Sequence, residues 1–89
     1  MLKISQSRPD QQTTTLRLEG RVVGPWVSEL QQICAPLLTG GKKLALDLAE
    51  VSFVDQNGVT LFWNLKTHGV ALLNPTPFVE EQLRSSAGG

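Results

Sequence analysis

Segments with the periodicity of a β-strand alternate along this sequence with segments that have the periodicity of a helix. Leucines recur at every second position over 16–18 and 44–48, with polar or small residues between them. Between these segments, residues 26–37 carry apolar side chains at helical spacing, as an amphipathic helix does. Because strands joined through a helix lie parallel in one sheet, this alternation predicts a β-α-β unit. It restricts the fold more than any other feature.

The same patterns continue toward both ends of the chain and predict the element order β-β-α-β-α-β-α. Polar residues at 8–12 predict a turn that joins the first two strands as a hairpin. The strands are expected at 2–5, 13–19, 44–48 and 70–73, and the helices from Pro25, over 59–68 and from Pro77.

Apolar residues occupy only one face of the expected strands, which indicates a sheet covered on one side. The other face would carry Thr15, Arg17, Ala45 and Asp47. Right-handed crossovers that step in one direction place all helices on the same face. We therefore predict an α/β fold: a small, mixed, mostly parallel sheet of about four strands with helices packed on one face.

Glycine and proline positions predict where these elements end. Pro36 is expected to bend the first helix or to end it about one turn early. Gly20 and Gly24 are expected to bracket a short connection that leads into this helix. We expect the third strand to end at Leu48, and the apolar segment 51–54 to form a bend before the next helix.

The last helix is expected to be capped by Thr76, whose hydroxyl can accept from a backbone N–H. Phe78, Val79 and Leu83 are its apolar residues, and we expect them to anchor it against the core. Residues 85–89 are small or polar, so a frayed end is predicted there.

Size and charge narrow the classes of function. The 89 residues are enough for a single domain over 1–89. Eight Lys and Arg residues balance eight Asp and Glu residues, so no strong field attracts nucleic acid or an anionic membrane. No apolar stretch approaches the roughly 20 residues of a membrane span, and the first residues lack the apolar core of a signal peptide. We expect a cytoplasmic domain whose weakly charged surface meets another protein.

Reactive side chains are scarce. Cys34 is the single cysteine and His68 the single histidine, which leaves no basis for an intrachain disulfide, a zinc site or Ser-His-Asp chemistry. Asp47 with Asp55 is the one acid pair worth considering for catalysis, but no cofactor motif accompanies it. We therefore expect no metal, no cofactor and no enzymatic activity.

The segment Asp-Gln-Asn-Gly at 55–58 is the strongest candidate for a functional site. Asp55 would accept hydrogen bonds from the first N–H groups of the following helix. Gly58 would allow another backbone or a partner to approach closely. The electropositive start of a helix also suits an anion or a regulatory phosphate. From residue types alone, the simplest interpretation is that Asp55 and Asn57 only begin a helix.

Residues spread over most of 13–84 match three spaced motifs. Leu16–Val22 matches L-x-L-x-G-x-[LIV], and Gly69–Val79 matches a closing strand, turn and helix. The pattern D-L-x-x-V-x-F-[IV]-D-[ST]-[ST]-G-[LV] is met in register by Asp47, Leu48, Val51, Phe53, Val54, Asp55, Gly58 and Val59. These motifs resemble those of the STAS family, the domain shared by sulfate transporters and bacterial anti-sigma factor antagonists. The resemblance implies a STAS-like β-α superhelix with its helices on one side.

The resemblance also implies a protein-binding module rather than an enzyme. Anti-sigma factor antagonists of this family bind an anti-sigma factor that is also a serine kinase. The kinase phosphorylates the residue just before the motif glycine, the complex separates, and a phosphatase restores binding. A phosphate adds about −1.5 to −2 charges, enough to disrupt a packed contact when carboxylates are nearby. Here it would lie close to Asp55.

The chain departs from the family at the phosphoacceptor, where Asn57 stands in place of Ser or Thr. Gln56 precedes it, and neither residue carries a hydroxyl. Three alternatives follow: a constitutive binder like the dephosphorylated form, regulation at Ser52 or Thr60 beside the same helix start, or another STAS role. The last would be an accessory subunit that binds an ABC-transporter ATPase in lipid transport. The simplest interpretation of Ser52 and Thr60 remains that of ordinary turn and helix residues.

Our leading hypothesis from the sequence is an anti-sigma factor antagonist-like module in a bacterial partner-switching pathway. Trp26 begins the first helix and is a candidate for the partner surface, although packing in the core is its simpler interpretation. The chain also ends sooner after its last helix than family members do, which we expect to expose a core edge and favour a homodimer. The expected partner surface combines the start of the 57–68 helix with the loop before the first helix: Asp55, Gln56, Asn57, Gly58, Val59, Gly20, Arg21 and Trp26.

Overall fold

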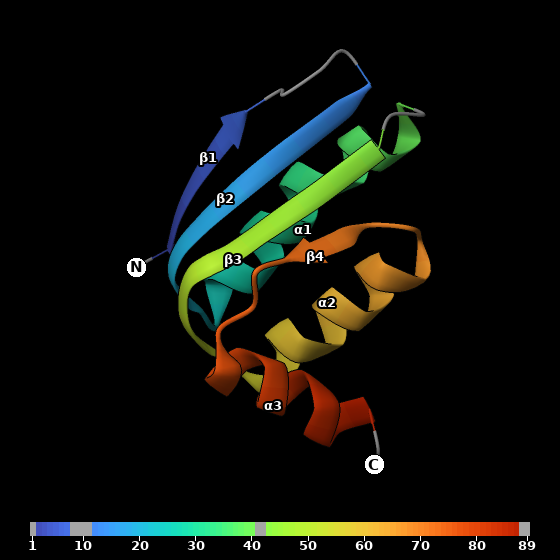
Figure 1. Cartoon of the computed structure of the whole chain (residues 1–89). Helices are drawn as coiled ribbons and strands as arrows, with labels where there is room; N and C mark the ends of the chain where they lie inside the picture. Colours follow the sequence, from blue (N-terminus) through green and yellow to red (C-terminus); the bar gives the residue numbers. More distant parts are fainter. Residues whose placement is uncertain (1, 8–11, 41–42, 88–89) are drawn as a thin grey trace.

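Strands and helices alternate through the part of the chain that the structure describes, residues 2–7, 12–40 and 43–87 of a computed structural model. Figure 1 shows the helices gathered against one side of the sheet, with α3 beside α2. The elements are β1 (Leu2–Ser7), β2 (Thr13–Val22), α1 (Pro25–Thr39), β3 (Lys43–Val54), α2 (Gln56–Thr67), β4 (Ala71–Leu73) and α3 (Pro77–Ala87).

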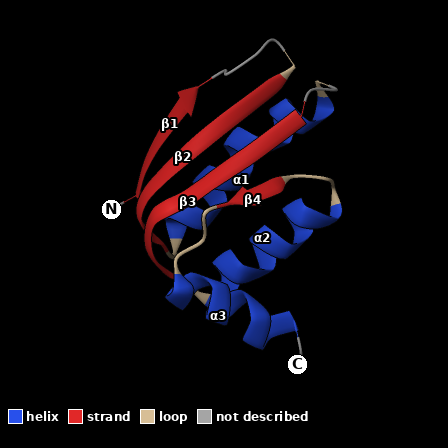
Figure 2. Cartoon of the chain, in the orientation of Figure 1, coloured by secondary structure: helices blue, strands red, loops and turns tan. Residues whose placement is uncertain are grey.

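The strands form a four-stranded sheet in the order β1-β2-β3-β4 (Figure 2). β1 and β2 are antiparallel, whereas β2–β3 and β3–β4 are parallel. α1 and α2 each connect one parallel strand to its neighbour in the same direction, so right-handed crossovers place both on one face. The predicted element order and fold class are confirmed. The predicted turn lies at 8–12, and its residues 8–11 are outside the described part of the chain.

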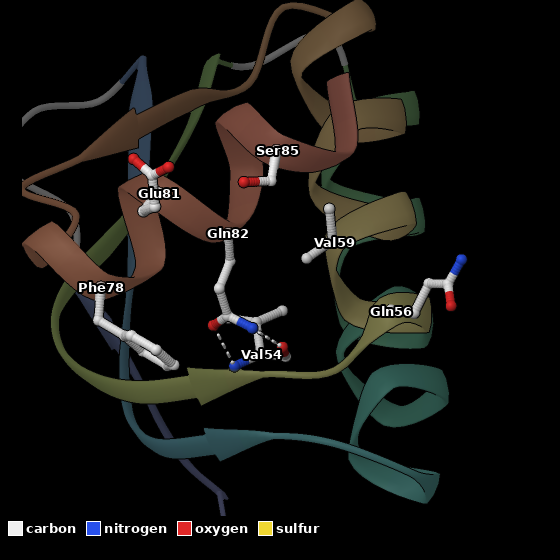
Figure 3. A pocket seen from close by; sticks show the side chains of 7 residues that line it. All are labelled: Val54, Gln56, Val59, Phe78, Glu81, Gln82 and Ser85. Carbon is white, nitrogen blue, oxygen red and sulfur yellow. Dashed lines mark hydrogen bonds between the residues drawn. The ribbon is translucent and has the colours of Figure 1, made fainter. Parts of the chain in front are cut away.

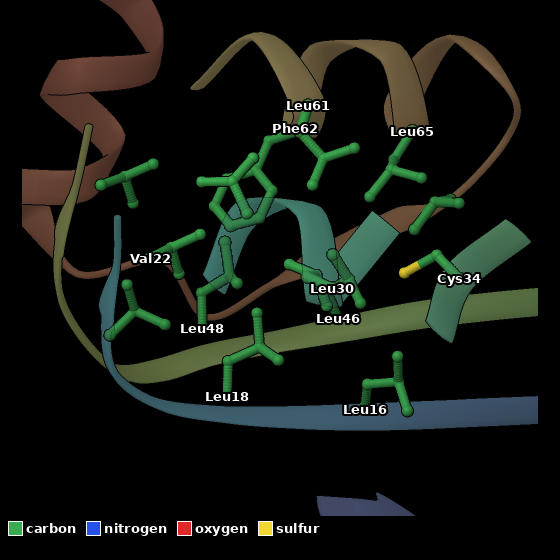
Figure 4. Close-up of a cluster of buried hydrophobic side chains, with 14 of the residues drawn as sticks. Leu16, Leu18, Val22, Leu30, Cys34, Leu46, Leu48, Leu61, Phe62 and Leu65 are labelled. Carbon is green, nitrogen blue, oxygen red and sulfur yellow. The ribbon is translucent and has the colours of Figure 1, made fainter. Parts of the chain in front are cut away.

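The core lies between the sheet and the helices, and Figure 4 shows its side chains meeting there. The leucines that alternate along β2 and β3 are buried as expected. Ala45 was expected on the solvent face but is 6% exposed. It lies on the central part of the sheet between Thr15 and Ala71, whose strands shield its small side chain from both sides. The largest fully buried side chains include Leu16, Leu18, Leu30, Leu46, Leu48 and Phe62.

β3 is longer than predicted, because it continues through the segment expected to bend. Its pairing with β2 shifts twice, between Arg17 and Glu19 and between Gly20 and Arg21. At each shift β3 contains one more residue than β2, which is the arrangement of a β-bulge. A bulge interrupts the alternation of side chains without ending the strand. The predictions of a strand end at Leu48 and of a bend at 51–54 are therefore wrong.

The same pairing corrects the prediction for Gly20. This residue lies within β2 opposite Val51, and β2 ends at Val22 opposite Val54. The connection to α1 is therefore only Val23 and Gly24. It is short because β2 and β3 both continue past their bulges to the same end of the sheet.

Pro36 does not end α1, which runs on to Thr39. A proline inside a helix removes the hydrogen bond to the carbonyl four residues earlier, here Gln32. Both Pro36 and Gln32 are exposed, so water can reach that carbonyl. The last turn is instead closed by Gly40 N–H and the Thr39 hydroxyl, which both donate to the Pro36 carbonyl.

α3 packs along the part of the β3 edge that does not pair with the short strand β4. β4 pairs with β3 only from Ala45 to Asp47. Further along, the side-chain amide of Gln82 accepts from Val54 N–H at 3.2 Å and donates to its carbonyl at 2.7 Å. This amide therefore bonds to β3 in the way that a neighbouring strand would.

The start of α3 has the predicted cap. The Thr76 hydroxyl accepts from Val79 N–H at 3.2 Å, which confirms its role. Val79 and Leu83 are buried as expected, but Phe78 is 54% exposed. Phe78 stacks on Phe53 of β3, with ring centroids 6.1 Å apart, instead of entering the core.

We expect Gln82→Ala to lower the free energy of unfolding by about 1–3 kcal/mol, because buried Val54 would lose a partner for both its N–H and its carbonyl. Urea denaturation followed by circular dichroism measures the change. Gln32→Ala removes an exposed helical glutamine and serves as the matched control, with a change within about 0.5 kcal/mol. Equal losses in the two variants would show that the edge contact contributes nothing.

Candidate functional site

The carboxylate of Asp55 connects the starts of two helices. Its Oδ1 accepts a hydrogen bond from Gly58 N–H at 2.7 Å, which confirms the predicted cap of α2. Its Oδ2 accepts from Gly24 N–H at 2.9 Å, at the start of α1. Its own N–H donates to the carbonyl of Val22, the last residue of β2. The second carboxylate bond was not predicted, since it joins residues 31 positions apart.

Gly24 has the backbone conformation that allows this bond. Its φ is +54°, in the range that favours glycine. It is the cap residue of α1 and has no side chain with which to cap that helix. Its N–H instead points to Asp55, while its carbonyl accepts from Val27 N–H. One carboxylate thereby holds the beginnings of α1 and α2 together at the end of β2 and β3.

Gly58 allows the close approach of another segment, as predicted. The segments that approach it are β2 and β3 of the chain's own sheet. A Cβ atom there would lie 2.6 Å from Val54 Cγ1 and 2.9 Å from the carbonyl oxygen of Val22. Val59, which follows, is 3% exposed. These two of the predicted surface residues are buried, so they position the surface rather than form it.

Gln56 and Asn57 are exposed in the first turn of α2. The positive end of the helix dipole lies in this turn. Two uncharged amide side chains therefore stand where the helix would favour a negative group. Figure 3 shows the Gln56 side chain directed away from Gln82 and Phe78 of α3.

The hydroxyls considered as alternative phosphorylation sites are both exposed and both engaged. Ser52 Oγ donates to the carbonyl of Gly20 at 3.3 Å, across the pairing of β3 with β2. Thr60 Oγ1 donates to the carbonyl of Gln56 at 3.1 Å, within α2. In this structure both hydroxyls are therefore hydrogen-bonded to backbone carbonyls.

The remaining predicted surface residues lie on β2 and α1. Gly20 and Arg21 belong to β2 rather than to a loop, and Arg21 is exposed opposite Phe53. Trp26 is the second residue of α1 and is half-buried against the core. It therefore contributes to packing and keeps part of its ring at the surface.

A groove of about 360 Å³ adjoins the start of α2, on the side of α3 (Figure 3). Sequence reasoning missed it because its walls come from two segments, 54–59 and 78–85, that are separated along the chain. No sequence signal pointed there, because Phe78 was expected to anchor α3 against the core. Its lining residues are Val54, Gln56, Val59, Phe78, Glu81, Gln82 and Ser85.

The reactive side chains considered in the sequence, Cys34, Asp47 and Asp55, are buried or hydrogen-bonded. Burial raises the pKa of the Cys34 thiol to about 11, so the thiol stays neutral and is a poor nucleophile. Asp47 and Asp55 are each engaged with nearby backbone N–H groups. Across residues 2–7, 12–40 and 43–87, no three acidic, His or Cys side chains are placed to hold a metal ion. Nor is any helix of that part both long and apolar enough to cross a bilayer.

Known structures share this fold. SpoIIAA, an anti-sigma factor antagonist, in its unphosphorylated form aligns with a TM-score of 0.80 at 20% identity, covering 96% of this chain and 81% of SpoIIAA. The phosphorylated form of SpoIIAA, a Bacillus cell fate determinant, aligns with a TM-score of 0.76 at 20% identity, over 94% and 83%. An antisigma-factor antagonist STAS domain from Rhodobacter sphaeroides has a TM-score of 0.63 at 12% identity, over 82% and 86%.

These similarities establish the predicted STAS-like fold. At such identities they concern the fold alone, and the functional residues must be argued from this chain. No family model and no curated protein sequence matches the chain.

We expect Gly58→Ala to destabilise the domain by about 1–3 kcal/mol, because the new methyl group overlaps Val54 and the Val22 carbonyl. Gly40→Ala is the control, since a Cβ there has no neighbour nearer than 3.6 Å and φ is ordinary. Thermal unfolding of the two variants compares them directly. A Gly58→Ala protein as stable as the control would contradict the close packing at the start of α2.

Proposed function

We propose that this chain is a non-enzymatic protein-binding module of the anti-sigma factor antagonist class, acting in the bacterial cytoplasm in a partner-switching pathway. The observation that carries the proposal is that Asp55 accepts two hydrogen bonds, one from the start of each helix. These bonds hold the first turns of α1 and α2 side by side. This arrangement places the starts of both helices at the carboxyl ends of β2 and β3. In open α/β sheets, binding sites are commonly built at that edge.

The partner would contact the exposed residues of this surface directly. These are Gln56 and Asn57 on α2, Arg21 at the end of β2, and the accessible part of Trp26. Asp55, Gly20, Gly58 and Val59 would hold these residues in place. The adjoining groove and the Phe53–Phe78 pair extend the surface with apolar area, and aromatic residues are frequent at the centre of protein interfaces.

Asn57 leaves the proposed surface uncharged at the position where the resemblance places the phosphoacceptor. An amide carries no charge and accepts no phosphate, so the binding form would persist in the presence of a kinase. The fold similarity to both forms of SpoIIAA supports the class of function. The same surface could serve an ABC-transporter ATPase, and the identity of the bound protein decides between these partners.

We expect Asn57→Asp to weaken binding to the cognate anti-sigma factor kinase by about tenfold or more, because a second carboxylate would stand beside Asp55 at the contact. Titration calorimetry with the purified kinase measures the affinity. The helix dipole favours an acidic residue in the first turn, so the variant should remain folded. Asn64→Asp, on an exposed position of α2 beyond this surface, is the control. An unchanged affinity for Asn57→Asp would exclude the proposed surface.

We expect no phosphoprotein when the wild-type chain is incubated with that kinase and ATP, whereas Asn57→Ser should become phosphorylated at residue 57. Phosphopeptide mapping by mass spectrometry distinguishes the positions. A phosphate on Ser52 or Thr60 of the wild-type chain would contradict constitutive binding and establish regulation at a neighbouring hydroxyl.

A further inference from the structure

The pair Asn57–Gly58 has a chemistry of its own, separate from partner binding. In an Asn-Gly sequence the backbone nitrogen of the glycine can attack the side-chain carbonyl carbon of the asparagine. The new C–N bond closes a cyclic imide, and the side-chain nitrogen leaves as ammonia. Water then opens the imide to aspartate or isoaspartate. Glycine favours this reaction because it has no side chain to hinder the ring closure.

The attacking nitrogen is occupied in this structure. Gly58 N–H donates to Asp55 Oδ1 at 2.7 Å, the shorter of the two hydrogen bonds that the Asp55 carboxylate accepts. Attack requires the nitrogen to lose its proton and to turn toward the Asn57 side chain. The carboxylate holds that proton in a charge-assisted hydrogen bond, which opposes both changes.

The surroundings of Gly58 also oppose ring closure. The residue is buried, and its Cα faces Val54 and the Val22 carbonyl so closely that no Cβ would fit. Asn57 lies within α2, and the helical backbone torsion at this residue keeps its side-chain carbonyl away from the next nitrogen. The reaction therefore needs the first turn of α2 to open, a local unfolding event.

We propose that Asn57 is a deamidation site that the Asp55 cap protects. Asn57 would then deamidate only when the start of α2 opens by local unfolding. The product is a negative charge at an exposed position next to Asp55. Aspartate in the first helical turn is favoured by the dipole, so this product can refold into α2. Isoaspartate adds a backbone carbon and cannot continue the helix. Conversion is irreversible without a repair enzyme.

The chain contains its own internal controls. Its other two asparagines are Asn64, followed by Leu65 inside α2, and Asn74, followed by Pro75. The side chain of Leu65 hinders attack by its own nitrogen, and Pro75 has no N–H. Deamidation by this route should therefore concentrate at Asn57 even in the unfolded chain.

The test follows the conversion of each asparagine by peptide mass spectrometry in the full chain, at mildly alkaline pH and a temperature below the unfolding midpoint. In denaturant we expect Asn57 to convert and the other two asparagines to stay largely intact. In the native protein the conversion of Asn57 should be slower by about tenfold or more, in proportion to the rarity of local opening. Equal rates in the native and denatured chains would overturn the proposal.

Substitutions at Asp55 then isolate the bond to Gly58. Asp55→Ala should speed conversion of Asn57 severalfold in the folded protein. Asp55→Ser keeps a cap acceptor for Gly58 but loses the bond to Gly24, so its rate should stay near that of the wild type. If Asp55→Ala does not fold, the deamidation rate of Asp55→Ser still tests the role of the cap. A folded Asp55→Ser protein that converts as fast as the denatured chain would overturn the role of the cap.

Discussion

Asp55 fixes the relative positions of α1 and α2, because each of its carboxylate oxygens accepts from the start of one helix. Gly58 and Gly24 provide the two N–H groups, and neither residue has a side chain that could cap a helix. The geometry depends on β2 and β3 lying parallel and ending together, with Val22 opposite Val54. A helix start left without such an acceptor exposes free N–H groups. The surface around Gln56 and Asn57 therefore depends on this single side chain.

The same end of the sheet is also held by α3, which lies along the outer edge of β3. β4 is only three residues long, so most of that edge has no neighbouring strand. Gln82 supplies the missing donor and acceptor to Val54, and Trp63 of α2 donates to the Leu83 carbonyl. These contacts place α3 beside the start of α2 and create the groove between them. The apolar pair Phe53–Phe78 stacks outside the core.

The Asp55 carboxylate caps α2 and, under our proposal, also controls the deamidation of Asn57. An amide is neutral and accepts no phosphate, but next to glycine it is chemically labile. The bond that begins α2 also engages the nitrogen on which that lability depends. Under our proposals, fold stability and the persistence of a neutral surface are linked through Asp55.

The sequence by itself determined the order of the elements, the single apolar face of the strands and the capping role of Asp55. These features arise from side-chain spacing and from hydrogen bonds between residues a few positions apart, so they can be predicted from the sequence. It did not determine that β3 continues past Leu48, because each bulge disturbs the alternation that marks a strand. Nor could it place Gln82 on Val54, Gly24 on Asp55 or the groove at Phe78. Those contacts join residues about thirty positions apart. They depend on which strand edges are left unpaired in the folded sheet and on which elements pack beside those edges, and only the tertiary structure decides both.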